Sequence, residues 1–249
     1  MDFGSCLQDK KVLITGGAGG VGRAVAERML AHGARVLITD RAEAHPEAVL
    51  SELRRVGAKR VDAIAADLSE RDGVTALFSH VDAALGGLDI LVACAGVGSG
   101  PLMEMDDAGW RNVIDSNLSS YVACTKQAID RIKVSGSKDG MIILVGSISV
   151  HIKAVGESVY NAAKGGVASF AETLRKELMP ESIRLTLIEP GAIGSAMQPF
   201  SAEERKRQVE EQKMLAPGEV AEAILFAATR PPGVDVVTLR IEPLVQKIY

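Results

Sequence analysis

Two groups of residues in this chain have the types and the spacing that hydride-transfer chemistry needs. The first is the glycine-rich run Thr15–Gly22, and the second is Ser147 with Tyr160 and Lys164. A glycine-rich turn can hold a dinucleotide pyrophosphate, and a tyrosine beside a lysine can move a proton near neutral pH. Each group alone is a weak signal. Together, in this order, they predict an oxidoreductase.

The glycine-rich run follows a predicted strand, Lys11–Thr15, and leads into a predicted helix, Gly20–His32. In that context the backbone can approach a phosphate closely, and amide groups at the start of the helix can bind it. The glycines fit two overlapping templates, so their spacing does not decide the subclass of dinucleotide-binding fold. A flexible turn without a ligand is the alternative. The cofactor contacts expected here are Gly16, Gly19, Gly20, Val21 and Gly22.

Acidic residues after the next two predicted strands indicate which dinucleotide would bind. Asp40 ends the second strand, where its carboxylate can bond both hydroxyls of an adenosine ribose and would repel a 2′-phosphate. This predicts NAD. Arg41 is adjacent and could turn toward a phosphate, so NADP remains open. Asp67 and Leu68, after the third strand, could place a carboxylate beside the adenine amino group.

Tyr160 and Lys164 are four residues apart, so on a helix their side chains share one face. Ser147 follows a predicted strand, at the carboxyl-end edge where parallel sheets bind ligands. A free tyrosine has a pKa of about 10, and a neighbouring ammonium lowers it by favouring tyrosinate. We expect Lys164 to lower the pKa of Tyr160 and hold the nicotinamide ribose, and Ser147 to donate a hydrogen bond to the substrate oxygen.

The elements that must position these residues alternate between short apolar runs and longer helical patterns. This alternation predicts a single doubly wound Rossmann-like α/β domain over residues 1–249, with a seven-stranded, mostly parallel sheet and helices on both faces. The cofactor half spans about 1–150. The expected strands are Lys11–Thr15, Arg35–Thr39, Arg60–Ala65, Asp89–Ala93, Met141–Gly146, Arg184–Ile188 and Val236–Ile241. The expected helices are Gly20–His32, Glu47–Val56, Arg71–Leu85, Tyr121–Val134 and Ser158–Met179.

The substrate half is expected to carry a lid over about 190–216. Within Pro190–Pro217 the chain becomes polar after Phe200, and the run that begins at Ser201 reads as an exposed helix. A mobile lid and a plain solvated surface helix are both open. The expected substrate pocket is mixed and mostly apolar, which favours an uncharged or weakly polar substrate. Its lining residues are Val97, Ser149, His151, Val155, Met197 and Phe200.

Composition narrows the class of partner. A formal net charge of −4 argues against a nucleic-acid or anionic-membrane partner, so we expect a small-molecule substrate. The three cysteines and four histidines are scattered without metal-ligand spacing, which predicts neither a disulfide framework nor a metal site. No run reaches the roughly 18 apolar residues of a membrane span. We therefore expect a soluble, cytoplasmic protein.

The motifs taken together resemble the short-chain dehydrogenase/reductase family along nearly the whole chain. The resemblance rests on the glycine run, Asn117, Ser147, the Tyr160-x-x-x-Lys164 pair and Pro190-Gly191, in the family's order. It implies catalysis by Asn117, Ser147, Tyr160 and Lys164, with Asn117 bending its helix and holding a proton-relay water. It also implies that a segment lies against the nicotinamide carboxamide. The residues of that segment are Pro190, Gly191, Ile193 and Ser195.

Two departures from the family pattern limit the resemblance. Cys94 stands before Ala95 and Gly96 where the family often has an asparagine that bridges to the neighbouring strand, although Gly96 still leaves the backbone open beside the cofactor. The family's usual C-terminal ending is replaced by Leu239–Pro243, which weakens the expected tetramer contacts at that edge. A homodimer or homotetramer through the helices at Tyr121 and Ser158 remains the expectation from the family.

The resulting prediction is an NAD-dependent oxidoreductase that interconverts a secondary alcohol and a ketone, with Tyr160 as general acid/base. An NADPH-dependent 3-oxoacyl or 3-hydroxy acid reductase is the alternative, and Asp40 argues against it. A non-catalytic nicotinamide-binding redox sensor is a third interpretation, from another class. Arg205 or Arg207 could capture a substrate carboxylate, and surface solvation is the other use for both.

Overall fold

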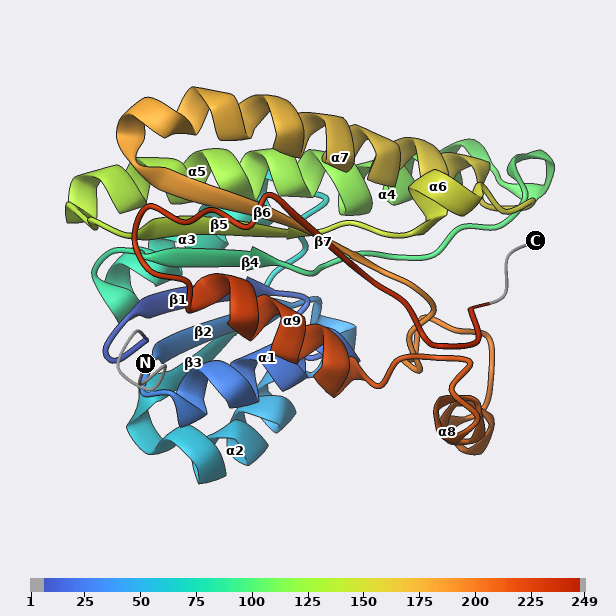
Figure 1. The fold of residues 1–249 in the computed structure, drawn as a ribbon, viewed down its shortest axis with the longest axis horizontal. Coiled ribbons are helices and arrows are strands. Elements are labelled where there is room, and N and C mark those ends of the chain that lie inside the picture. Colours follow the sequence, from blue (N-terminus) through green and yellow to red (C-terminus); the bar gives the residue numbers. More distant parts are fainter. Residues whose placement is uncertain (1–6, 247–249) are drawn as a thin grey trace.

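A parallel β-sheet of seven strands runs through the middle of the molecule (Figure 1). The computed structural model describes residues 7–246. The strand order is β3-β2-β1-β4-β5-β6-β7, and every neighbouring pair is parallel. The strands are β1 Lys11–Thr15, β2 Arg35–Asp40, β3 Val61–Ala65, β4 Ile90–Ala93, β5 Gly140–Val145, β6 Ile183–Pro190 and β7 Thr238–Ile241.

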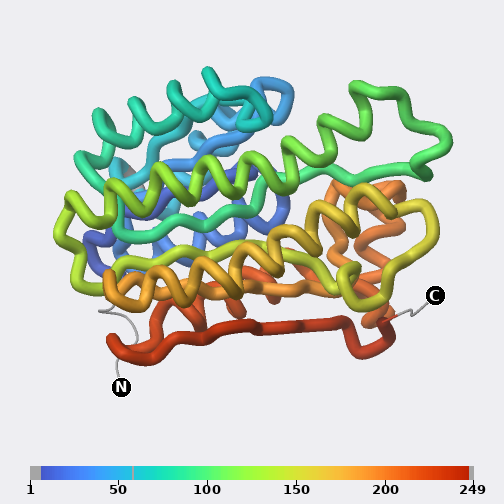
Figure 2. The backbone as a smooth tube through the Cα atoms, turned by 90° about the horizontal axis from the view of Figure 1, so that it is seen from above, coloured from blue at the N-terminus to red at the C-terminus, as the bar shows by residue number. Residues whose placement is uncertain are grey.

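Helices cover both faces of this sheet. Helices α1, α2 and α9 pack on one face and α3, α5 and α7 on the other, so the fold is the doubly wound α/β sandwich that the sequence predicts (Figure 1 and Figure 2). The helices are α1 Gly20–Ala31, α2 Pro46–Gly57, α3 Arg71–Leu85, α4 Asp107–Ile114, α5 Ser120–Ser135, α6 Ser149–Ile152, α7 Ser158–Leu178, α8 Ala202–Glu210 and α9 Pro217–Ala228.

Strand β1 shows how the sequence builds both cores. Val12 and Ile14 are fully buried in the cluster with α1 and α9, while Leu13 is buried in the cluster on the opposite face. Successive side chains of a strand point to opposite faces, so a strand covered on both sides must be apolar throughout. This explains why the short Val, Ile and Leu runs predict the strands well.

The predicted strands agree with the structure to within two residues at each end, and the expected exposed helix after Ser201 is α8. The Ser201 hydroxyl caps it by accepting a hydrogen bond from the Glu204 amide at 3.1 Å. The structure adds α4, α6 and α9 to the helices that the sequence predicts. It also shows a π-helical turn, Asp115–Ser119, between α4 and α5.

Candidate active site

The glycine turn after β1 is held by its own backbone. Gly16 has a φ of 67°, a left-handed conformation that favours glycine, and the Gly17 amide donates to the Thr39 carbonyl at 3.0 Å. A Cβ on Gly22 would collide with the Gly16 carbonyl oxygen. The turn therefore brings bare backbone to the start of α1, as a pyrophosphate requires.

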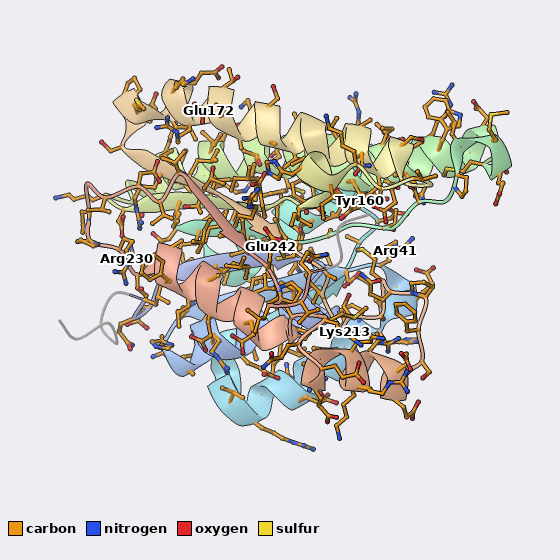
Figure 3. All side chains as sticks on the ribbon, turned by 45° about the vertical axis from the view of Figure 1, so that its right-hand side comes forward. Arg41, Tyr160, Glu172, Lys213, Arg230 and Glu242 are labelled. Atoms are coloured by element: carbon orange, nitrogen blue, oxygen red, sulfur yellow. The ribbon has the colours of Figure 1, made fainter. Side chains whose placement is uncertain are left out.

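Asp40 lies directly against this turn. Its Oδ2 accepts a hydrogen bond from the Ala18 amide at 3.1 Å, and its Oδ1 accepts one from the Arg41 amide at 2.9 Å. The carboxylate is thus fixed beside the turn, while the Arg41 side chain is exposed. Figure 3 shows Arg41 and Tyr160 at the same end of the molecule, away from Glu172 and Arg230.

The next two candidates on the adenine side lie at the end of β3. One oxygen of the Asp67 carboxylate, Oδ1, accepts hydrogen bonds from the amide and the hydroxyl of Ser69, at 2.9 and 2.7 Å. Leu68 is buried in the core on the α3 face. Asp67 is therefore anchored by its own turn, and both of these bonds use the same oxygen.

The segment after β4 is tied to β1 by Thr15, which begins the glycine-rich run but had no predicted role of its own. The Thr15 hydroxyl oxygen accepts hydrogen bonds from the Cys94 and Ala95 amides, both at 3.2 Å. In the family, an asparagine at the position of Cys94 would make this bridge. Here Thr15 makes it from the neighbouring strand, β1. Cys94 therefore leaves no gap between β1 and β4.

Asn117 sits in the middle of the π-helical turn and is fully buried. Its Nδ2 donates to the carbonyls of Val97 and Val113, both at 2.9 Å. Its Oδ1 has no hydrogen-bond partner in the protein, and it lies where a Cβ on Gly96 would collide with it. An unpartnered buried oxygen is an acceptor available to a bound group or a water.

Ser147, Tyr160 and Lys164 converge after β5. The hydroxyls of Ser147 and Tyr160 share a hydrogen bond, and Lys164 follows one turn later on α7, buried. The Lys164 ammonium donates to the Val145 carbonyl at 2.9 Å and to the Tyr121 hydroxyl at 3.0 Å. The structure thus brings together three residues that the sequence places in one site.

The protonation of this group differs from the sequence-based expectation. Burial raises the pKa of Tyr160, and the bond from Ser147 opposes that rise. The expected lowering by Lys164 is absent because its ammonium is directed at Val145 and lies 5.9 Å from the centroid of the Tyr160 ring. Burial also lowers the pKa of Lys164 to about 7, so near neutrality its charge is only partial.

The segment after β6 runs beside these residues. The Pro190 carbonyl accepts a hydrogen bond from the Ile148 amide at 2.9 Å, next to Ser147. The Gly191 amide donates to the Ile241 carbonyl at 2.7 Å, and Ile193 forms a parallel bridge with Leu215 at the base of the expected lid. A Cβ on Gly20 would lie 3.6 Å from the Cβ of Ser195, so this segment also reaches the glycine turn.

The expected substrate-lining residues fall into two groups. Ser149 is buried, its amide donates to the Ser147 hydroxyl oxygen at 3.1 Å, and its own hydroxyl has no partner in the protein. Met197 lies within 4 Å of a Cβ built on Gly98. The Val155 side chain, by contrast, is fully exposed.

Three further residues shape the site without having been predicted. Tyr121 contacts Lys164, the buried Glu189 pairs with His151 at 3.0 Å, and Gln246 accepts a hydrogen bond from the Ala192 amide at 3.0 Å. Tyr121 had a signal, because it is four residues after Asn117 and therefore close to the same helical face. Glu189 and Gln246 had none, since their partners are distant in sequence.

No cluster of three or more His, Cys, Asp or Glu side chains able to hold a metal ion occurs within residues 7–246. In the same part of the chain, no helix is long and apolar enough to cross a membrane. Cys94 and Cys124 are free thiols, and Cys6 lies outside the described residues.

Comparison with known proteins identifies this arrangement. The family model described as short chain dehydrogenase matches residues 10–206. The chain belongs to the short-chain dehydrogenase family. It is therefore an oxidoreductase of a family that binds a nicotinamide cofactor and acts on alcohol- or ketone-type substrates. This family assignment agrees with the resemblance that the motifs predict.

Individual family members are similar over most of their length. The cis-4-hydroxycyclohexanecarboxylate dehydrogenase of Sinomonas cyclohexanicum is 34% identical, covering 91% of this chain and 92% of that protein. The 3-oxoacyl-acyl-carrier-protein reductase of Aquifex aeolicus is 29% identical, covering 88% and 90%. A crystal structure of a single-residue variant of actinorhodin polyketide ketoreductase with NADPH superimposes with a TM-score of 0.84 at 26% identity, covering 97% of this chain and 98% of that one.

Proposed function

We propose that this protein is an NAD-dependent dehydrogenase that interconverts a secondary alcohol and a ketone. The observation that carries the choice of NAD is the Asp40 carboxylate, which the Ala18 amide holds against the glycine turn at 3.1 Å. A carboxylate at that place accepts hydrogen bonds from ribose hydroxyls and repels a 2′-phosphate. The bare backbone of the turn, Asp40 and the unpartnered Oδ1 of Asn117 together fit a nicotinamide dinucleotide.

The chain's own residues would divide the remaining work. Tyr160 exchanges a proton with the substrate oxygen, while Ser147, already hydrogen-bonded to it, donates to the same oxygen as charge develops. Lys164 holds the nicotinamide ribose with its ammonium. A bound nicotinamide would supply or accept the hydride. Because burial raises the pKa of Tyr160, the proton exchange needs a positive charge nearby, and the Lys164 ammonium, one turn later on α7, would supply it while holding the ribose.

The surroundings of the site favour an uncharged, apolar substrate. Met197 and Phe200 are partly exposed beside helix α8. Arg205 donates to the Phe200 carbonyl and Arg207 pairs with acidic residues of its own helix and the residue after it, so both arginines already have partners. We therefore assign neither Arg205 nor Arg207 to the binding of a substrate carboxylate.

The basic residue among the expected lining residues, His151, already has an acidic partner. Glu189 is buried at the end of β6, next to the strand that precedes Ser147, and its partner is His151. The relative from Sinomonas cyclohexanicum is named for a hydroxycyclohexanecarboxylate. We therefore expect this chain to prefer an unsubstituted or alkyl-substituted cyclohexanol over its carboxylated counterpart.

A second candidate is an NADPH-dependent reductase of 3-oxoacyl or related keto substrates. Arg41 favours it, because its exposed side chain begins beside Asp40 and could reach a 2′-phosphate. The Aquifex aeolicus relative is named as a 3-oxoacyl reductase, and the superimposed ketoreductase structure contains NADPH. The sensor interpretation is weaker, since the protein positions proton-transfer groups that a sensor does not need.

The deciding experiment is a fluorescence titration with NADH and, separately, NADPH at the same pH and salt. Tighter NADH binding supports the proposal, and tighter NADPH binding favours the reductase. Absence of binding by both would contradict the assignment of a cofactor site. A panel of cyclohexanols with and without a carboxyl group, assayed with the better cofactor, then tests the substrate class. Faster turnover of the carboxylated members would contradict the role given to Glu189.

A further inference from the structure

Beneath Lys164 lies a buried tyrosine hydroxyl that the proposed chemistry does not use. Tyr121, on α5, is 1% exposed and donates its proton to the Val145 carbonyl at 3.1 Å. Lys164 donates to the same carbonyl and to the Tyr121 oxygen. Three elements, α5, α7 and the end of β5, therefore meet in a closed triangle of hydrogen bonds.

The direction of these bonds determines what the hydroxyl can do for the lysine. Because the Tyr121 proton is committed to Val145, the Tyr121 oxygen can only accept a hydrogen bond from Nζ of Lys164. An acceptor stabilises the ammonium over the neutral amine. Burial raises the pKa of Tyr121 well above its ordinary value, so this hydroxyl stays neutral and keeps its proton.

The other groups around Lys164 offer little to hold its charge. The titratable groups that face it are Tyr121 from α5, Tyr160 from its own helix and Cys94 from the segment after β4. Burial raises the pKa of the Cys94 thiol to about 12, so it is neutral near pH 7. Within residues 7–246 no carboxylate lies within salt-bridge distance of Lys164. The ammonium therefore depends on two neutral oxygens, those of Tyr121 and Val145.

We propose that Tyr121 is a positioning residue whose hydroxyl keeps Lys164 protonated and aligned under the nicotinamide ribose site. This deepens the proposed function and rests on it for the part that concerns the cofactor. The ring alone would fill the space between α5 and the sheet, and phenylalanine would do that as well as tyrosine. The hydroxyl is therefore the part of Tyr121 that serves Lys164.

The test compares two substitutions that each remove one buried hydroxyl from α5. Tyr121→Phe removes the acceptor of Lys164. Thr125→Val, one turn later, removes a hydroxyl that is equally buried and has no hydrogen-bond partner. The readout is the titration of Lys164 by NMR of ε-¹³C-lysine-labelled protein without cofactor. The Lys164 signal is assigned by its loss in Lys164→Met.

In the wild type the Lys164 signal should titrate near the pKa of about 7 that burial imposes. We expect Tyr121→Phe to lower that midpoint by about one pH unit, because the ammonium loses one of its two acceptors. Thr125→Val should leave the midpoint unchanged. An unchanged midpoint in Tyr121→Phe, or an equal shift in both variants, would overturn the proposal.

A measurement on the unaltered fold covers the case in which Tyr121→Phe does not fold. The chain has three tyrosines, so fluorotyrosine-labelled wild-type protein gives a ¹⁹F spectrum that is simple to assign. The Tyr121 signal should shift with the same midpoint as the Lys164 signal, since the hydroxyl loses its charged donor there. Independent midpoints for the two residues would contradict the proposal.

The proposed link from Tyr121 through Lys164 to cofactor binding is tested by the pH dependence of NADH affinity. We expect NADH binding to weaken as Lys164 loses its proton, and to weaken at a pH about one unit lower in Tyr121→Phe. Absence of NADH binding in the wild type would refute the proposed function, while the lysine titration would still decide the role of Tyr121. A weakening at the same pH in both proteins would refute the link from Tyr121 to the cofactor.

Discussion

The glycine turn after β1 and the polar group after β5 lie at the same edge of the sheet but are held in different ways. Gly16 and Gly22 fix the turn through backbone geometry, with a φ of 67° at Gly16 and no room for a Cβ at Gly22. Lys164 and Tyr160 are instead held by side-chain hydrogen bonds to neutral partners. We expect substitutions in the turn to damage structure and binding together, and substitutions in the polar group to alter chemistry while the fold survives.

Tyr160→Phe should give the largest effect and the sharpest separation between chemistry and binding. Removal of the hydroxyl deletes the transferred proton, so turnover of a secondary alcohol should fall by at least about 10³-fold. NADH affinity should stay within about twofold, because Tyr160 adds no charge to the cofactor site. Steady-state kinetics and a fluorescence titration measure the two quantities. Near-normal turnover would remove Tyr160 from the proposed mechanism.

Gly22→Ala tests the backbone side of the comparison. Its Cβ would meet the Gly16 carbonyl, so we expect a loss of about 1 to 3 kcal/mol in the free energy of unfolding together with weaker NADH binding. Urea unfolding and the same fluorescence titration measure these effects. Gly100→Ala is the matched control, because a Cβ there meets nothing within 4 Å. Equal behaviour of the two variants would contradict the idea that backbone geometry fixes the turn.

Asp40→Ala should change selectivity between cofactors more than stability. Removing the carboxylate removes the repulsion of a 2′-phosphate, so the ratio of NADPH to NADH affinity should rise by about tenfold. Glu43→Ala, which removes an exposed carboxylate three residues later, should leave that ratio near its wild-type value. If Asp40→Ala left the ratio unchanged, the proposed contact with the adenosine ribose would be wrong.

Lys164→Met should give the smallest change in stability at neutral pH, and its sign should depend on pH. Burial lowers the pKa of Lys164 to about 7 in the folded protein. Above that pH the folded protein loses the Lys164 proton, while the unfolded chain keeps it until about pH 10. Wild-type stability should therefore gain from this group as pH rises from about 7 toward 10, by up to about 1.4 kcal/mol per pH unit.

The Lys164→Met variant lacks that gain. We expect it to be more stable than the wild type by about 1 kcal/mol at pH 7, since relief of the buried charge is partly offset by the lost bonds to Tyr121 and Val145. By about pH 9 the order should reverse. Urea unfolding at both pH values measures this, with Lys206→Met on the exposed helix α8 as control. Parallel pH dependence in all three proteins would argue against a lowered pKa at Lys164.

Much of this arrangement could be predicted from the sequence because its signals are local. The apolar run in Lys11–Thr15 has the length of a buried strand, the glycines follow directly, and Tyr160 and Lys164 are one turn apart. Parallel strands then bring their carboxyl ends to one edge without further information. The family resemblance, confirmed by comparison, supplies the role expected of Asn117 from outside the local pattern.

What the sequence could not predict depends on contacts between distant segments. The expected lowering of the Tyr160 pKa assumes that the lysine charge faces the tyrosine, whereas the ammonium is directed at Val145 and Tyr121. The bridge from Thr15 to Cys94 joins residues 79 positions apart. Burial and the direction of a flexible side chain are properties of the packed protein, and no sequence spacing encodes them.

The π-helical turn at Asp115–Ser119 gives this site a particular sensitivity to changes in chain length. A π turn holds about one residue more than an α turn, and each residue of a helix rotates the next by about 100°. Deleting a single residue within Asp115–Ser119 would restore an ordinary helical turn and remove the wide turn that holds Asn117 beside Val97 and Gly96. We therefore expect insertions and deletions in this short stretch to disturb the site more than most substitutions in it.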